Sequence, residues 1–387
     1  MKILMVGKFP LDAKLFKDGT EGSVYGEAKT LVEKGHKVIV LDMPRSIIDK
    51  DYHETVDGIE VYRFFCAEDS LKQQKKVIRK RLIPLMLSCD PSICHLHVTQ
   101  HHSLQVVSAL RRHKIKYLVE IHGLPRKEAK QAFRKQKTLP KLFAWWYECF
   151  REFVFVRNTH LVVTDTDYEK QALRKFAFRH KLDIHVIHQG IHDDFYQQDY
   201  HPQDNTLLAV GTIAPRKDQL MMLDVVDKLR KDIPDIKLSI VGGLVDLDYY
   251  KKLQTRIVRK DLARHVSLHP DVHAIELLKQ YSRSRLFMLC ASEESQCVAM
   301  AEAMAVGLPV VSTKVGGIKH LLSEGDNGFL CAHGDVKAMV KHIKNLLQHP
   351  DLCQQMSERN KKDAEKYRWS SIVEKYIKLY AKAMKDK

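Results

Sequence analysis

The sequence predicts an α/β protein built from two Rossmann-like domains, each with a parallel β-sheet. The chain has 387 residues, which is too long for one small core and fits two domains. Short apolar runs alternate with helical patterns, and strands separated by crossover helices form parallel sheets. The alternation is interrupted once, by the polar segment 188–205, which has the composition of an interdomain linker.

The first half of the chain contains six short apolar runs that we predict to be buried strands. They are Lys2–Val6, Lys37–Leu41, Ile93–Val98, Tyr117–Ile121, Leu161–Thr164 and Ile184–Ile187. Ser23–Lys34, between the first two runs, has a helical pattern that Gly35 closes.

The second half repeats this pattern and ends in a helical tail. The predicted strands are Thr206–Val210, Lys237–Val241, His265–Leu268, Leu286–Cys290 and Pro309–Ser312, and the predicted helices are Gln219–Lys231, Ala299–Val306 and Asp335–Leu347. From about Pro350 to Lys387 apolar side chains recur at helical spacing, as in a packing helix. We therefore expect domains over 1–190 and 191–365, followed by a helix over 366–387 that can pack back on the first domain.

The net charge of +16 points to an acidic partner, such as nucleic acid, anionic lipid or a nucleotide diphosphate. No 18-residue uncharged apolar stretch occurs. The apolar run before Lys8 is too short for a signal peptide and fits a first strand better. We expect a cytoplasmic location, with the inner face of the membrane as a second place of action.

Soft metal ligands are concentrated in one stretch of the sequence. It contains Cys89, Cys94, His95, His97, His101 and His102. Their spacing matches no standard structural zinc site, and His95 and His97 alternate as they would on a strand that ends near a cleft. We predict no metal site, and a chain of this size needs no disulfides.

The most informative stretch for function is Ala291–Val311 (ASEESQCVAMAEAMAVGLPVV). It follows a predicted strand, and ligands of open α/β sheets bind where such strands end. Glu294 would lie in the loop, where it can accept hydrogen bonds from sugar hydroxyls, and Glu302 on the next helix can bind a ribose diol. The amides of Ser295, Gln296, Cys297 and Val298 would open that helix and face a phosphate. The alternative is two surface glutamates, but the small residues Ala301–Ala305 favour tight burial.

Two further loops fall at the same predicted sheet edges. In Val210–Lys217 (VGTIAPRK), Gly211 permits a tight turn, and Arg216 and Lys217 could meet a diphosphate rather than form a solvated pair. In Lys17–Gly26 (KDGTEGSVYG), three glycines including Gly19 permit close approach to a ligand. His122 in EIHGLP ends another strand; a lone histidine is more often structural, but this one is well placed for cleft chemistry.

Ala291–Val311 resembles the E-x7-E signature of retaining glycosyltransferases of family 4, with Glu294 and Glu302 as its two acids. Other landmarks resemble this family in the expected order along nearly the whole chain. They are GHKVIVL at 35–41, IHG at 121–123, VVTDTDYEKQAL at 162–173, VIHQGI at 186–191 and VGGIKHLLSEGDNGFL at 315–330. The resemblance implies a GT-B fold, in which two Rossmann-like domains face each other across a cleft. It also implies metal-independent transfer from a UDP- or GDP-sugar with retained anomeric configuration and without a cofactor.

By this resemblance Glu294 contacts the transferred sugar and Glu302 binds the nucleotide ribose. Arg216 and Lys217 resemble the cations that neutralise the leaving diphosphate, where fixed charges stabilise the developing anion. Gly19 resembles the glycine of the first-domain loop that approaches the phosphates. His122 lies where the family has an acceptor-side histidine.

The sequence departs from the family pattern at several positions. Thr212 replaces a frequent arginine, and Ser295, Gln296 and Cys297 replace the usual Gly-Phe-Gly. Gln189 stands for asparagine in the linker motif, and Lys319-His320 replaces Pro-Glu. These changes leave the donor sugar unassigned and keep open a catalytically degenerate binding or partner subunit. A sugar-nucleotide epimerase would match the motifs less well, and the basic runs match no nucleic-acid motif.

Positive charge is concentrated in Lys72–Arg81 and Arg126–Arg157, and the second segment also contains eight aromatic residues. A basic aromatic helix can lie in an anionic membrane interface. The alternative is aromatic side chains packed in a core with a solvated basic face. An acceptor glycan or lipid-linked acceptor, in the synthesis of cell-surface polysaccharide or glycolipid, would agree with the membrane interpretation.

Overall fold

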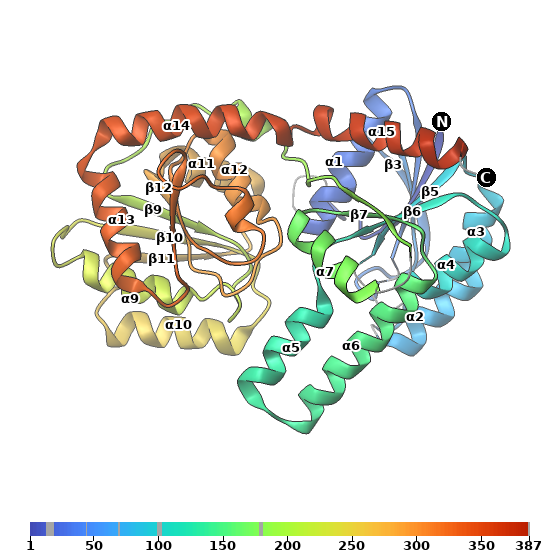
Figure 1. Ribbon diagram of the computed structural model, residues 1–387, viewed down its shortest axis with the longest axis horizontal. Coiled ribbons are helices and arrows are strands. Elements are labelled where there is room, and N and C mark those ends of the chain that lie inside the picture. Colours follow the sequence, from blue (N-terminus) through green and yellow to red (C-terminus); the bar gives the residue numbers. More distant parts are fainter. Residues whose placement is uncertain (13–18, 44, 69, 99–102, 178–180, 386–387) are drawn as a thin grey trace. The chain divides into compact units, whose positions relative to one another are not determined.

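The computed structural model describes residues 1–12, 19–43, 45–68, 70–98, 103–177 and 181–385. These residues form two compact α/β units (Figure 1). Unit 1 contains the described residues up to Gln189 together with the segment from Trp369 onward, and unit 2 contains Gly190–Arg368. The chain therefore leaves unit 1, forms unit 2 and returns to unit 1.

Eight strands formed by the described residues make the sheet of unit 1, in the order β3-β4-β2-β1-β5-β6-β7-β8. Their bounds are β1 Lys2–Gly7, β2 Lys37–Asp42, β3 Tyr52–Val56, β4 Ile59–Arg63, β5 Ile93–Val98, β6 Tyr117–Ile121, β7 Leu161–Thr164 and β8 Asp183–Val186. Neighbouring strands are parallel except for β3 and β4. The strand order changes direction between β1 and β5, which makes this the switch point of the sheet.

The β3–β4 hairpin was not predicted from the sequence. Asp57 and Gly58 connect its strands, and both have positive φ angles, 48° and 78°. Two such residues form the tight turn that matches the twist of an antiparallel pair. The search for apolar runs missed β3 because its side chains are half-buried or exposed, although Asp-Gly between Val56 and Ile59 was a usable signal.

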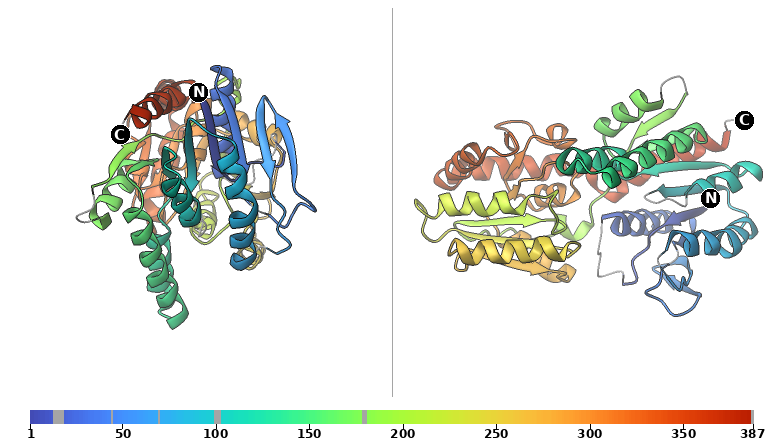
Figure 2. Two further views of the ribbon diagram at one scale, coloured as in Figure 1. Left: turned by 90° about the vertical axis from the view of Figure 1, so that its right-hand side faces the viewer. Right: turned by 90° about the horizontal axis from the view of Figure 1, so that it is seen from below.

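Helices cover both faces of the sheet of unit 1. Their bounds are α1 Gly19–Glu33, α2 Leu71–Val77, α3 Ile83–Ser88, α4 Ser103–Arg112, α5 Pro125–Gln136, α6 Leu139–Arg157, α7 Asp167–Ala177 and α15 Trp369–Lys385, with a π-helical turn, Ile78–Leu82, between α2 and α3. In β1, Ile3 and Met5 join the core beneath α1 and α15, whereas Leu4 and Val6 join the core on the other face. A parallel sheet is buried on both faces in this way. The α5–α6 hairpin projects from the rest of unit 1 (Figures 1 and 2).

The expectation of a glycine-rich ligand loop over Lys17–Gly26 was wrong for most of that segment. Helix α1 begins at Gly19, so that Gly26 lies within the helix. A Cβ atom at Gly26 would overlap the indole of Trp369 on α15. Gly26 is therefore required for close packing of these two helices.

The predicted helical tail is two helices separated by a short turn. Helix α14, Pro350–Ala364, belongs to unit 2, and α15 belongs to unit 1. A 3-10 turn, Glu365–Tyr367, separates them. Trp369, Tyr376 and Tyr380 of α15 are buried in a core of unit 1.

The described part of unit 2 has a six-stranded sheet in the order β11-β10-β9-β12-β13-β14, and all of its pairs are parallel. The strands are β9 Thr206–Val210, β10 Lys237–Gly242, β11 Val266–Pro270, β12 Leu286–Leu289, β13 Val310–Thr313 and β14 Gly328–Cys331. The other helices are α8 Asp193–Tyr196, α9 Gln219–Leu229, α10 Leu247–Arg259, α11 Ala274–Arg283, α12 Val298–Val306 and α13 Val336–Gln348. The four-residue β14 was not predicted. The switch point of this sheet lies between β9 and β12.

Candidate active site

The loops after β9 and β12 meet at the switch point of the sheet in unit 2. The two strands are neighbours and run parallel, so both loops leave the same edge of the sheet. Open α/β sheets bind their ligands at this position. The backbone amide of Ser292 in the second loop donates to the carbonyl oxygen of Arg216 in the first, at 2.9 Å. This hydrogen bond fixes the two loops against each other.

Lys217 and Glu294 form a buried ion pair between these loops. The ammonium group of Lys217 donates to Oε1 of Glu294, and the two residues are only 8% and 5% exposed. Gly211 provides room for the lysine, because a Cβ atom there would lie 3.0 Å from Cε of Lys217. The sequence predicted both residues for the site, and the structure brings them into contact.

Arg216 approaches the same carboxylate from a more exposed position. Its Nη1 lies 3.2 Å from Oε1 of Glu294 and donates to the carbonyl oxygen of Glu293 at 3.0 Å. The side chain of Arg216 is 38% exposed. Two cations thus share one carboxylate, and the remaining positive charge favours an anionic ligand.

Gly316 and Gly317 hold the backbone of Glu294 in place. The amide of Gly317 donates to the carbonyl oxygen of Glu294 at 3.0 Å. Gly316 has a φ of +50°, and a Cβ atom there would overlap the same carbonyl oxygen. The sequence marked the Gly-Gly pair only as a family landmark, whereas the structure gives it a positioning role.

The segment between Glu294 and α12 has an unusual backbone conformation at Cys297. Cys297 is the residue before the helix and has a left-handed φ of 59°. This conformation costs a non-glycine residue roughly 1–2 kcal/mol, which explains the usual glycine at the corresponding family position. Gln296 and Cys297 are buried, and Ser295 and Val298 are half-buried. The first turn of α12 thus begins next to Glu294.

Glu302 lies on α12, where its carboxyl group accepts a hydrogen bond of 2.8 Å from the hydroxyl of Tyr281. Burial raises the pKa of Glu302 to about 7, and the bond from Tyr281 only partly opposes this shift. The residue as a whole is half-buried. With a pKa of about 7, the carboxyl group is protonated in part of the molecules at neutral pH, so it can either donate a hydrogen bond to a pair of hydroxyls or accept one from them.

We expect Glu302→Gln to change how the stability of unit 2 depends on pH. The pKa of Glu302 rises from 4.5 to about 7 on folding, so the folded state binds the additional proton. The free energy of unfolding therefore falls as the pH rises from about 4.5 to 7. The variant cannot ionise, and we expect it to exceed the parent by about 1–3 kcal/mol at pH 8.

Urea unfolding at pH 5 and pH 8 measures this difference. Glu276→Gln, on the exposed surface of α11, is the matched control and should leave the pH dependence of the parent unchanged. If Glu302→Gln and the parent lost the same stability between these pH values, the assignment of the raised pKa would be wrong.

In unit 1, His122 follows β6 and lies in a cluster of buried polar groups. Its Nε2 is 3.2 Å from Nδ1 of His97, and its Nδ1 is 3.0 Å from Nε2 of Gln189 and 3.5 Å from Oδ2 of Asp165. Burial alone would lower the pKa of His122, but the nearby carboxylates of Glu120 and Asp165 raise it to about 9. These carboxylates favour a protonated imidazole, whereas the contact with Nε2 of Gln189, which can only donate, requires Nδ1 of His122 to accept.

The cluster continues to His95, which bridges two carboxylates. Nδ1 of His95 lies 2.9 Å from Oε1 of Glu27, and its Nε2 lies 3.1 Å from Oε2 of Glu120. The hydroxyls of Tyr376 and Tyr380 on α15 donate to Glu120 and Glu27, each at 2.6 Å. Burial lowers the pKa of His95, but these two carboxylates outweigh it and raise the value to about 9.

The cysteines of the sequence cluster do not accompany these histidines. Cys94 joins the apolar core on the opposite face of β5 from His95, and His101 and His102 lie outside the described residues. Ligand atoms of Glu27, His95, His97 and Glu120 do lie within 4.8 Å of one another, as a divalent cation would require. The hydrogen bonds from Tyr376 to Glu120 and from Tyr380 to Glu27, and the bond between His95 and Glu27, favour a proton-sharing network instead, and absence of a metal stays a prediction.

Glu169 positions the backbone around His122. Its Oε1 accepts from the amide of Gly123 at 3.0 Å, and its Oε2 accepts from the amides of Asp165 and Thr166 at 2.9 and 3.1 Å. Thr166 and Glu169 have the spacing of a capping box at the start of α7. This spacing was a signal in the sequence that the prediction of site residues did not use.

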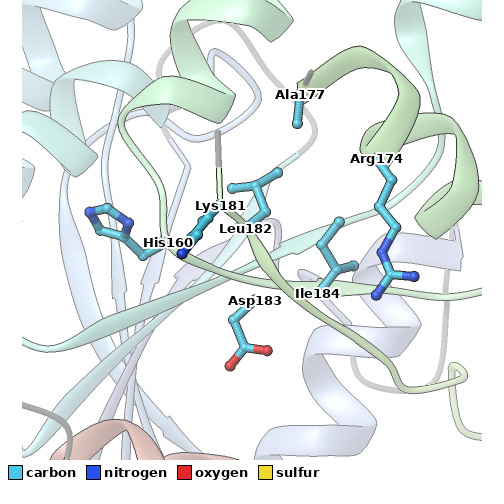
Figure 3. Close-up of a pocket in the computed structure, with 7 residues that line it drawn as sticks. All are labelled: His160, Arg174, Ala177, Lys181, Leu182, Asp183 and Ile184. Atoms are coloured by element: carbon cyan, nitrogen blue, oxygen red, sulfur yellow. The ribbon is translucent and has the colours of Figure 1, made fainter. Parts of the chain in front are cut away.

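Two features of unit 1 add nothing to the candidate site. Gly19 is the first residue of α1, and most of the segment before it lies outside the described residues, so its predicted phosphate contact stays a prediction. A surface hollow is present near the amino ends of β7 and β8 (Figure 3). Its lining includes His160, Arg174 and Asp183. It therefore lies at the other ends of the strands from His122.

Comparison with known proteins gives two adjoining family matches. Residues 192–363 match the family described as glycosyl transferases group 1, and residues 17–195 match glycosyltransferase family 4. An uncharacterized glycosyltransferase of Haemophilus influenzae is 30% identical over 175 residues, which are 45% of this chain and 48% of that protein. The chain spans about half the length of the curated relatives it matches.

Solved structures show the same fold over the whole chain. A sucrose-phosphate synthase from Thermosynechococcus elongatus has a TM-score of 0.82 at 17% identity, with 99% of each chain covered. Anabaena HepE in complex with UDP and glucose has a TM-score of 0.77 at 16% identity, covering 99% of this chain and 100% of that one. The two predicted Rossmann-like domains and the GT-B fold class are thereby confirmed.

Proposed function

Because the chain belongs to the group 1 glycosyl transferases, we propose that it transfers a sugar from a nucleoside-diphosphate sugar to an acceptor hydroxyl, with retention at the anomeric carbon. The observation that carries this proposal is the convergence of Arg216 and Lys217 on Glu294 at the switch point of unit 2. Two cations and a carboxylate at the carboxyl ends of parallel strands suit a ligand with both phosphates and hydroxyls.

The proposed roles follow from the charge that develops during transfer. When the bond between the sugar and the diphosphate breaks, negative charge accumulates on the phosphate oxygens. Arg216 and Lys217 stabilise this charge, since preformed cations need little reorganisation as the charge develops. The start of α12 adds its dipole near the same group. Glu294 accepts hydrogen bonds from the hydroxyls of the transferred sugar.

Glu302 completes the proposed donor site of unit 2, and His122 of unit 1 has a proposed role of its own. Glu302 binds the two ribose hydroxyls of the nucleotide, for which a carboxyl group with a pKa of about 7 is suited, because it can donate or accept. His122, which follows β6 in unit 1, has a proposed role on the acceptor side, with its two ring nitrogens held by His97 and Gln189. The nucleotide is UDP or GDP, and the complex of HepE with UDP supports the first of these. The acceptor is a glycan or a lipid-linked saccharide of the cell surface.

We expect UDP or GDP, and the corresponding nucleotide sugar, to stabilise the protein against unfolding. A ligand that binds only the native state at about 100 times its Kd adds about 2.7 kcal/mol to the free energy of unfolding. Thermal unfolding is measured with UDP and GDP, with their sugar derivatives, and with AMP for comparison, and the nucleotide that stabilises the protein most is identified in this way. The released nucleotide is then measured with and without added saccharides, and NMR of the product gives the anomeric configuration.

The outcomes separate the two functions that the sequence left open. Binding followed by slow hydrolysis or transfer supports the enzyme, and an inverted product would overturn retention. Binding without release of nucleotide under any condition would favour the catalytically degenerate partner subunit. If none of the nucleotides stabilised the protein, the donor site itself would be wrong.

A further inference from the structure

One face of α6 exposes a row of large apolar side chains. We define the α6 face as Leu139, Phe143, Trp146, Phe150 and Phe153, which recur every three or four residues and so lie on one side of the helix. Phe143 and Trp146 are each 70% exposed and Phe150 is 67% exposed. Among the described residues, every strongly exposed large aromatic side chain is on this helix, including Tyr147 beside the face.

The other side of α6 accounts for how the helix is held. Phe155 and Val156, near its carboxyl-terminal end, are buried in a core of unit 1. Trp145 stacks on Phe133 of α5, with ring centroids 6.0 Å apart. Arg126 of α5 pairs with Glu152 of α6 at 3.1 Å. These contacts fix the hairpin and turn the α6 face away from α5.

The alternative of a packed aromatic core with a solvated basic face is therefore wrong for the residues of the α6 face. The other basic segment, Lys72–Arg81, contains no aromatic residue. There Val77 and Ile78 are buried and Lys76 and Arg79 are exposed, as in an ordinary surface helix. The two basic segments thus differ in where their apolar side chains lie: they are buried in Lys72–Arg81 and exposed on the α6 face.

Positive charge flanks the α6 face. The hairpin 125–157 contains nine lysines and arginines and three acidic residues. Both acids of α6 are in ion pairs, Glu148 with Arg151 at 2.8 Å and Glu152 with Arg126 at 3.1 Å. Lys137 is exposed just before the helix, and Arg157 at its end lies over the ring of Phe153, 4.9 Å from the centroid. Cations therefore flank the apolar face at both ends.

We propose that the α6 face docks on an anionic lipid bilayer, with its aromatic side chains in the interfacial layer and the flanking cations among the headgroups. Aromatic rings and cations are the side chains that suit this layer. A second copy of the chain would bring two hairpins of the same charge together, which disfavours a dimer through this face. No helix of the described residues is both long and apolar enough to cross a membrane, and this mode of binding requires none.

The proposal concerns unit 1 and does not depend on the ion pair of Lys217 and Glu294. Its consequence for activity rests on the proposed function: a docked enzyme would meet an acceptor that is anchored in the same bilayer. Transfer to a lipid-linked acceptor would then be faster than transfer to the same saccharide in solution.

Flotation of the full chain with vesicles tests the proposal. Phosphatidylcholine vesicles with about one third phosphatidylglycerol should bind the protein. Binding should be at least about tenfold weaker with pure phosphatidylcholine vesicles, and also with the anionic vesicles at high salt. The triple variant Phe143→Ser/Trp146→Ser/Phe150→Ser should lose at least about tenfold of the binding to anionic vesicles. The control replaces exposed apolar residues of unit 2, Leu247→Ser/Val258→Ser/Ile275→Ser, and should bind as the parent does.

Three results would overturn the proposal. The parent could fail to float with anionic vesicles, the triple variant could float as well as the parent, or sedimentation could show a dimer that the triple variant abolishes without any vesicle binding. Thermal stabilisation by nucleotide, measured in the same variants, is a separate readout. If nucleotide stabilisation were absent while vesicle binding remained, the proposed function would fail and the docking surface would stand.

Discussion

Replacing Lys217 with alanine is expected to lower kcat by about 10²–10³-fold while the fold remains intact. Lys217 is the more buried of the two cations at Glu294, and its loss removes a fixed charge from the place where the diphosphate departs. Arg216, 3.2 Å from the same carboxylate, still compensates the charge of Glu294 in the variant. Steady-state rates with the nucleotide sugar identified by thermal unfolding measure the effect.

The controls for this prediction use a second ion pair and a double variant. Lys344 pairs with Asp232 at 2.9 Å on the surface of unit 2, and Lys344→Ala should leave kcat unchanged. Glu294→Gln should be as damaging as Lys217→Ala, and the double variant should be little worse than either, since residues that act as a unit are not additive. Unchanged rates in both single variants would refute the assigned site.

Gly316→Ala is expected to destabilise unit 2 and to abolish most donor binding. An alanine at the left-handed φ of +50° costs roughly 1–2 kcal/mol, and its Cβ would also overlap the carbonyl oxygen of Glu294. Because both colliding groups are attached to backbone, relief requires the Glu294 loop to move. We expect a total loss of about 3 kcal/mol or more in the free energy of unfolding, with weaker nucleotide binding.

Gly325→Ala is the control that separates the cost of a left-handed backbone from the cost of the overlap with Glu294. Gly325 has a similarly positive φ of +83°, but a Cβ atom there would meet nothing within 4 Å. This variant should lose only the roughly 1–2 kcal/mol of the left-handed conformation and should bind nucleotide normally. Urea unfolding and nucleotide titration of both variants give the comparison, and equal behaviour would show that contact with Glu294 is unimportant.

Most of the fold was predictable because buried parallel strands are continuous apolar runs. Leu286–Leu289, for example, is wholly buried and was recognised on that basis. The same criterion could not find β3, whose residues lie in an antiparallel hairpin with accessible side chains. We expected a separate helix over 366–387 at the end of the tail, but helical periodicity does not show which unit it joins, and only tertiary packing assigns α14 and α15 to different units.

The candidate site was predictable by residue type but not by contact. The sequence named Lys217 and Glu294, which are 77 positions apart, and only the pairing of β9 with β12 brings their loops together. The protonated state favoured for His122 could not be read from the sequence, because it depends on carboxylates of Glu120 and Asp165 that the fold supplies. Exposure of the α6 face likewise could not be read from the sequence, because it depends on which side of the helix packs against α5 and the core of unit 1.

The return of α15 to unit 1 has a consequence for synthesis on the ribosome. The side chains of α15, among them Trp369, Tyr376 and Tyr380, close a core whose remaining members lie in the first half of the chain. The tyrosine hydroxyls donate to Glu120 and Glu27, and the indole of Trp369 packs against Gly26. The nascent first unit therefore emerges with an open apolar groove that stays uncovered while all of unit 2 is translated. The yield of correctly assembled protein would therefore depend on chaperones that protect this groove while unit 2 is being translated, and not only after translation is complete.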